Sequence, residues 1–188
     1  MLFYALCGFA TIITPHLFML FAGRKDFKEF FRQNITVSEF SLQSKRQQQF
    51  AQLSLFLNGI WSIGFLFGLG RLLNIQFLSL FTFLSLLTLV SFFGSAITLN
   101  KKDFRIHGYF GMSALVCLTL IKIVFGVLCL TVHPLLGQFS IGVGSVEAGT
   151  FAVLLSRRKW NATAMIEISY TTILSIWVFV LSLYMLFV

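Results

Sequence analysis

QFLSLFTFLSLLTLVSFFGSAIT, residues 76–98, is a stretch of 23 residues without a charged side chain. A helix that crosses the hydrocarbon core of a bilayer needs about 20 mainly apolar residues, so this stretch predicts a membrane-spanning helix. The whole chain has the same character, since 57% of its 188 residues are hydrophobic and only 11% are charged. Soluble domains usually carry about 25% charged residues, so the composition indicates an integral membrane protein.

Five further apolar stretches have similar length, and the connections between them are short except for one. The predicted fold is therefore all-α, a polytopic membrane protein whose six transmembrane helices form one bundle and one domain, residues 1–188. The predicted spans are 2–22, 50–70, 76–98, 107–130, 138–155 and 165–187.

The one long connection, residues 23–49, is polar and mixed in charge. Its Phe27, Phe30 and Phe31 recur at helical spacing, which favours an amphipathic helix along the membrane surface. Ser38 and Glu39 favour the start of a second short helix, because an acid is stabilising near a helix N-terminus.

The basic residues are divided unequally between the two sides of the predicted bundle. Cytoplasmic loops of membrane proteins carry an excess of Lys and Arg, so the richer side is predicted to be cytoplasmic and both termini non-cytoplasmic. The opposite side has Arg71 alone. This distribution explains the net charge of +8 by orientation in the membrane, and we expect no nucleic-acid partner. The residues on the predicted cytoplasmic side are Arg24, Lys25, Lys28, Arg32, Lys45, Arg46, Lys101, Lys102, Arg105, Arg157, Arg158 and Lys159.

Two ionisable residues lie deep inside predicted spans. Lys122 is in the fourth span and Glu147 in the fifth, each roughly 12–14 Å from the outer end of its helix at 1.5 Å per residue. Consecutive antiparallel helices are usually neighbours, and charges inside a membrane normally face the bundle and pair. We therefore expect a Lys122–Glu147 pair.

Three interpretations of Lys122 and Glu147 are open. The pair could serve only to hold two helices together, it could line a polar cavity that holds a ligand headgroup, an ion or a proton, or Lys122 could extend outward unpaired. The glycines 142, 144 and 149 leave room for a ligand or for a close backbone. Asn58, in the second span, is the third residue assigned to the ligand site.

A second polar group gathers towards the predicted cytoplasmic side. His16, Asp103, His107 and Glu167 could perform acid–base chemistry or bind a metal, and paired His could hold haem. No HExxH or CxxCH motif is present, so capping or interfacial roles are the simpler interpretation and no cofactor is expected. Asp103, His107 and Glu167 remain the catalytic candidates, and His16 and His107 the metal-ligand candidates.

Small and hydroxyl side chains follow regular spacing in two spans. Residues 79–98 present Ser or Thr every three to four positions, which favours a packing seam whose hydroxyls bond to their own helix backbone. Gly64 and Gly68 form a GxxxG pattern typical of helix contacts.

Four segments resemble a family of small six-helix bacterial and archaeal membrane proteins, domain of unknown function 998. They are ITVSEFSL (35–42), FLNGIWSIGFLFGLGRLL (56–73), KKDFRIHGYFG (101–111) and MIEISYTTILSIWVFVLS (165–182). The resemblance implies the plasma (inner) membrane of a prokaryote. It aligns the family's polar positions with Asp103, His107, Asn58 and either Ser38 or Ser41, and it implies no established activity.

The leading functional hypothesis is a non-enzymatic membrane protein that binds or handles a lipidic or small polar ligand in an intramembrane cavity. The alternatives are a membrane-embedded, metal-assisted hydrolase, or a structural or regulatory subunit that binds a membrane-protein partner or a second copy of itself. The sequence does not decide whether the protein is an enzyme.

Overall fold

The computed structural model describes residues 1–23, 36–74, 79–156 and 164–188, with side chains omitted at 18–23, 153–156 and 164–167. This part of the chain contains seven helices and no strand, which confirms the all-α prediction. The helices are α1 (Leu2–Gly23), α3 (Val37–Ser41), α4 (Lys45–Leu72), α5 (Leu80–Thr98), α6 (Phe104–Cys129), α7 (Pro134–Ser156) and α8 (Ala164–Phe187).

Four helical segments are long and apolar enough to cross a membrane. They are α4, α5, α6 and residues Ile168–Phe187 of α8, while α1 contributes a shorter apolar segment, Leu2–Leu17, within the described side chains. Their lengths and composition indicate a membrane protein.

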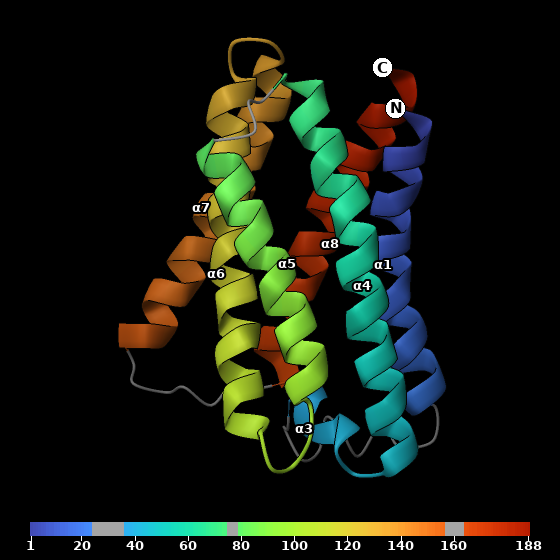
Figure 1. Cartoon of the computed structure of the whole chain (residues 1–188). Helices are drawn as coiled ribbons and strands as arrows, with labels where there is room; N and C mark the ends of the chain where they lie inside the picture. Colours follow the sequence, from blue (N-terminus) through green and yellow to red (C-terminus); the bar gives the residue numbers. More distant parts are fainter. Residues whose placement is uncertain (24–35, 75–78, 157–163) are drawn as a thin grey trace.

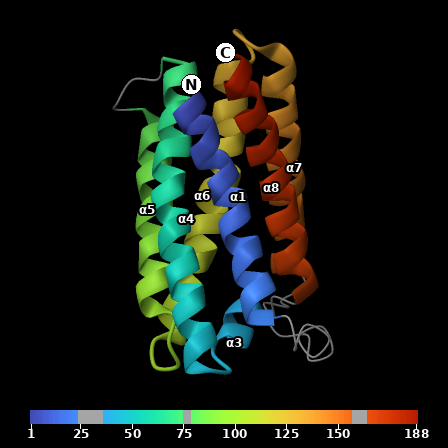
Figure 2. The same cartoon turned by 90° about the vertical axis from the view of Figure 1, so that its right-hand side faces the viewer.

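The six long helices run side by side, and their neighbours follow a closed order (Figures 1 and 2). Helix α1 packs against α4 and α8, α5 lies between α4 and α6, and α7 packs against α6. Contact between α7 and α8 completes the order but is sparse. Helix α3 lies at one end of the molecule, and both chain termini lie at the other (Figure 1).

Local sequence explains where several helices begin and end. Helix α4 begins five residues before the predicted span, because Ser44 is its N-cap and accepts a hydrogen bond from the Gln47 N–H. Helix α7 begins at Pro134, since proline at a first helical position costs no hydrogen bond. Asn74, just past α4, has φ 49°, a left-handed conformation that Asn tolerates better than most residues.

Helix α3 confirms the short helix expected at residues 38 and 39. Its N-cap is Thr36, whose hydroxyl accepts from the Glu39 N–H at 3.1 Å. The Glu39 carboxylate in turn accepts from the Thr36 N–H at 2.8 Å. This reciprocal capping box stabilises a helix of only five residues. The predicted helix at 27–31 lies outside the described residues.

Two side-chain patterns predicted from the sequence, the hydroxyls of α5 and the GxxxG motif of α4, are confirmed. In α5, the hydroxyls of Ser85, Thr88, Ser91 and Thr98 bond to carbonyls four residues earlier in their own helix. Ser85, Thr88 and Ser91 are buried, as a packing seam requires. Gly64 and Gly68 face α1: a Cβ on Gly64 would overlap Cys7, and a Cβ on Gly68 would overlap Tyr4. The GxxxG face therefore packs inside this chain.

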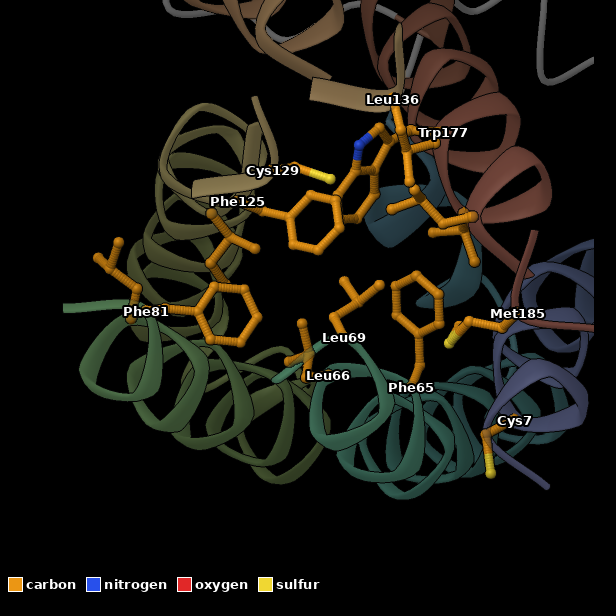
Figure 3. Packing of buried hydrophobic residues seen from close by; sticks show 14 of the residues in the cluster. Cys7, Phe65, Leu66, Leu69, Phe81, Phe125, Cys129, Leu136, Trp177 and Met185 are labelled. Atoms are coloured by element: carbon orange, nitrogen blue, oxygen red, sulfur yellow. The ribbon is translucent and has the colours of Figure 1, made fainter. Parts of the chain in front are cut away.

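An aromatic core fills the half of the bundle nearer the termini. Figure 3 shows Trp177 of α8 among Phe65 of α4, Phe125 of α6 and Leu69. The Trp177 ring meets those of Phe65 and Phe125 edge to face, with centroids 5.8 and 6.2 Å apart. Such pairs add about 0.5–1.5 kcal/mol beyond their burial. This packing holds Trp177 beside the site described next.

Candidate functional site

A buried ion pair joins α6 to α7. The Lys122 Nζ lies 2.6 Å from Glu147 Oε1 and 2.5 Å from Oε2. The two side chains are 0% and 1% exposed, so both charges are removed from solvent. The pair that the sequence predicts is therefore present, and the interpretation in which Lys122 extends outward unpaired is wrong. Removing one member of such a pair typically costs about 3–5 kcal/mol, because the other charge stays buried.

Polar and aromatic groups complete the surroundings of the pair. Thr119, one turn before Lys122, donates its hydroxyl to Glu147 Oε2 at 3.0 Å. The Lys122 ammonium lies 5.2 Å from the Tyr170 ring centroid and 5.6 Å from that of Trp177, both on α8. These distances allow cation–π attraction, so three helices contribute to one site.

Close backbone packing brings the two charged side chains into register. A Cβ on Gly144 of α7 would lie 2.7 Å from Ile123 Cγ1 and 3.2 Å from the Thr119 carbonyl oxygen of α6. Nearer the connecting turn, Gly126 and Gly137 approach each other equally closely. Small residues allow this approach, and Glu147 then lies one turn from Gly144, opposite Lys122.

An apolar groove lies between α7 and α8. Its volume is about 410 Å³. Val143 lies one turn before Glu147, and Ile173 lies one turn from both Tyr170 and Trp177, so the groove runs along the helices that carry the site. Trp177 Nε1 donates to Ser140 Oγ at 3.0 Å and links the two helices on their inner side. The groove is lined by Phe139, Gly142, Val143, Val146, Ile173 and Ile176.

Asn58, the third residue assigned to the ligand site, lies on α4. Its Oδ1 is buried and has no hydrogen-bond partner among the described residues. The structure therefore does not join Asn58 to the pair by a hydrogen bond within the described part of the chain.

The second polar group is only partly brought together. His107 is buried, with Nδ1 2.8 Å from the Ser95 carbonyl oxygen. Asp103 occupies the N-cap position of α6, but its carboxylate accepts from the Asn100 side chain at 3.0 Å. His16 is exposed on α1 and bonds to its own helix at Ile12. The Glu167 side chain lies outside the described residues.

Metal binding by these residues finds no support in the described side chains. No group of three or more His, Cys, Asp or Glu side chains is close enough there to hold a metal ion. His16 lies on α1 and His107 on α6, and these helices are separated in the neighbour order by α4 and α5.

Sequence reasoning missed several residues of the site. Tyr170 gave no signal, because one hydroxyl in an apolar helix is common and its partner is decided by packing. The aromatic partners of Lys122 are on α8, so helical spacing within α6 could not identify them. Thr119 could have been noticed by its position one turn from Lys122 on the same face.

Comparison with known proteins adds no further constraint, since no family model, curated protein or solved structure matches the chain.

Proposed function

We propose that the chain is an integral membrane protein with six crossings that binds a lipidic ligand between α7 and α8, beside Lys122 and Glu147. The observation that carries this proposal is an apolar groove of about 410 Å³ whose wall includes Val146, the residue before Glu147 of the buried ion pair. Ligand pockets in proteins commonly have volumes of about 300–1,000 Å³ and mainly apolar walls.

The six-crossing arrangement is supported by several features. Both termini lie at one end of the bundle, as an even number of crossings requires (Figure 1). Lys45, Arg46, Lys101 and Lys102 precede or begin helices at the opposite end, and Arg71 ends α4 near the termini. By the positive-inside rule, the end with α3 faces the cytoplasm. The resemblance to domain of unknown function 998 remains a prediction.

The chemistry of the site favours a neutral or zwitterionic lipid. The charges of Lys122 and Glu147 cancel, so the site has no net charge with which to select an anionic head group. A ligand with one charge would also compete for one residue and leave the other unpaired at a cost of several kcal/mol. The ligand's hydrocarbon chain would occupy the groove, and its polar end would be directed toward the pair.

Two glycines on α7 provide a matched test. Gly142 lines the groove and Gly149 lies two turns further along α7, and a Cβ at either would meet no atom within 4 Å. Gly142→Leu therefore directs a side chain into the groove from a position with room for its Cβ, while Gly149→Leu makes the same change outside it. Native mass spectrometry in mild detergent, with added dioleoyl phosphatidylethanolamine or phosphatidylglycerol, measures lipid retained per chain.

The expected result is a one-to-one phosphatidylethanolamine adduct in the native protein and in Gly149→Leu, reduced at least tenfold in Gly142→Leu. Phosphatidylglycerol should be retained more weakly. Equal adducts in all three proteins, or none in the native protein, would overturn the proposal. The pair would then have only the structural role of holding α6 against α7.

The subunit alternative loses its main structural argument, because Gly64 and Gly68 pack against α1. The metal-assisted hydrolase alternative has no supporting cluster among the described residues.

A further inference from the structure

A second polar cluster lies at the end of the molecule that carries α3, away from the ion pair. His107 of α6 reaches two other elements through its two ring nitrogens. Its Nε2 lies 2.8 Å from the Ser38 hydroxyl of α3, and its Nδ1 lies 2.8 Å from the carbonyl oxygen of Ser95 in α5. The Ser95 hydroxyl is also 3.0 Å from Nδ1. Three segments of the chain therefore meet at one imidazole.

The partners of the imidazole determine which nitrogen carries its proton. A carbonyl oxygen can only accept a hydrogen bond, so the Nδ1 facing Ser95 must be the protonated nitrogen of neutral His107. The lone pair is then on Nε2 and accepts a hydrogen bond from the Ser38 O–H. This is the arrangement of a serine nucleophile and its general base, with a backbone carbonyl in the orienting position that a carboxylate holds in many hydrolases.

The surrounding packing fixes this geometry. The Phe104 ring stacks on the His107 ring, with centroids 5.8 Å apart and planes 19° from parallel. Ser38 belongs to the first turn of α3, which the Thr36–Glu39 capping box stabilises. The imidazole is 5% exposed and Ser38 is half-buried, so Ser38 is the more exposed of the two residues. Nucleophilic catalysis requires a base held within hydrogen-bond distance of the attacking hydroxyl, and this geometry supplies it.

A shallow depression of about 450 Å³ is lined by immediate neighbours of the two residues. Its walls include Glu39, the residue after Ser38, and Phe104, which stacks on His107. Leu42 supplies apolar surface and Lys101 a positive charge. An amphipathic molecule with a hydrocarbon part and an anionic or polar head suits this mixed lining.

We propose that Ser38 and His107 form a nucleophile–base pair that hydrolyses a carboxylic ester of an amphipathic lipid. Ser38 Oγ attacks the ester carbonyl carbon while its proton passes to His107 Nε2. The bond from carbon to the alcohol oxygen breaks, and His107 returns the proton to the leaving alcohol. Water, deprotonated by His107, then attacks the acyl-serine, which releases the carboxylic acid and restores the Ser38 hydroxyl.

A fluorophosphonate reagent tests the serine directly, because it labels base-activated serines. The serine oxygen bonds to phosphorus, and the P–F bond breaks with release of hydrogen fluoride. The full chain in mild detergent should be labelled at Ser38, as located by peptide mass spectrometry, and should hydrolyse p-nitrophenyl butyrate. Ser38→Ala should lose both, and His107→Gln should lower the labelling rate about 100-fold or more.

Ser44→Ala is the matched control, since Ser44 lies in the same segment but donates its hydroxyl to Gln47 Oε1. It should be labelled at Ser38 at the native rate. Ser38→Ala keeps the capping box, and a melting curve verifies that each variant is folded. The proposal is overturned if the folded native protein is not labelled at Ser38, or if ester hydrolysis persists unchanged in Ser38→Ala.

Discussion

The ion-pair site and the His107 cluster both join three parts of the chain through polar side chains, but they do so with different chemistry. Lys122 and Glu147 carry opposite charges, are at most 1% exposed, and are accompanied by the Thr119 hydroxyl and two aromatic rings. His107 is neutral when Nδ1 donates to Ser95 and Nε2 accepts from Ser38, and Ser38 is only half-buried.

Because of this difference, the ion pair should matter mainly for stability and the His107 cluster mainly for reactivity. A charge that loses its partner inside the bundle cannot be solvated by water, so removing either member of the ion pair should strongly destabilise the fold. A neutral imidazole near the end of the bundle costs less to leave unpaired, and its Nε2 lone pair, which accepts from Ser38, can take up a proton. We therefore expect the largest stability effects at the pair and the clearest chemical effects at His107.

Breaking the ion pair should have the largest effect. Glu147→Leu leaves the Lys122 ammonium buried without a counter-charge, and we expect it to lower the free energy of unfolding by about 3–5 kcal/mol. Denaturant or thermal unfolding in detergent, followed by circular dichroism, measures this. The double variant Lys122→Met/Glu147→Leu should regain most of the loss, because it removes both charges. If the single variant is as stable as the native protein, the pair does not hold α6 against α7.

Removing the imidazole should have a smaller effect on stability. His107→Leu abolishes the hydrogen bonds to Ser38 and Ser95, and we expect a loss of about 1–3 kcal/mol in the same unfolding measurement. His16→Leu is the matched control, since His16 is exposed, and it should change stability by less than about 0.5 kcal/mol. A loss at His107 as large as that at Glu147 would contradict the contrast between the two clusters.

The aromatic surroundings of the pair allow a finer test. Tyr170→Phe removes the hydroxyl that donates to the Leu115 carbonyl oxygen at 2.9 Å but keeps the ring beside Lys122. We expect a loss of about 1 kcal/mol, in the range of one hydrogen bond. Tyr109→Phe, at a side chain 68% exposed, should leave the unfolding midpoint unchanged. A loss above about 3 kcal/mol would mean that the hydroxyl itself holds the pair.

The smallest global effect is expected at the cap of α3. Thr36→Ala removes the hydroxyl that accepts from the Glu39 N–H, which typically costs about 0.5–2 kcal/mol of local helix stability. Because α3 is short and terminal to the bundle, hydrogen exchange at 37–41 should accelerate while the unfolding midpoint barely moves. Unchanged exchange in α3 would show that contacts with His107, rather than the cap, hold this helix.

Local sequence predicted the helices because length and hydropathy are properties of a continuous segment. The boundaries were less accurate where polar residues extend a helix: α4 begins at Lys45, since Ser44 caps it, whereas an apolar pattern starts only at Phe50. The pairing of Lys122 with Glu147 was predictable for a related reason. Both lie on consecutive antiparallel helices at similar depth, and two buried charges have few other partners.

The sequence by itself determined the helical composition and the unequal distribution of basic residues, and it predicted the ion pair, because each depends on one segment or on two adjacent ones. The tertiary structure decided that Lys122 is paired with Glu147 and does not extend outward. Only the tertiary structure decided that α8 places Tyr170 and Trp177 beside Lys122. It also decided that Ser38 meets His107, 69 residues away. Such contacts depend on how distant segments pack against one another, and residue spacing along the chain carries no information about that packing.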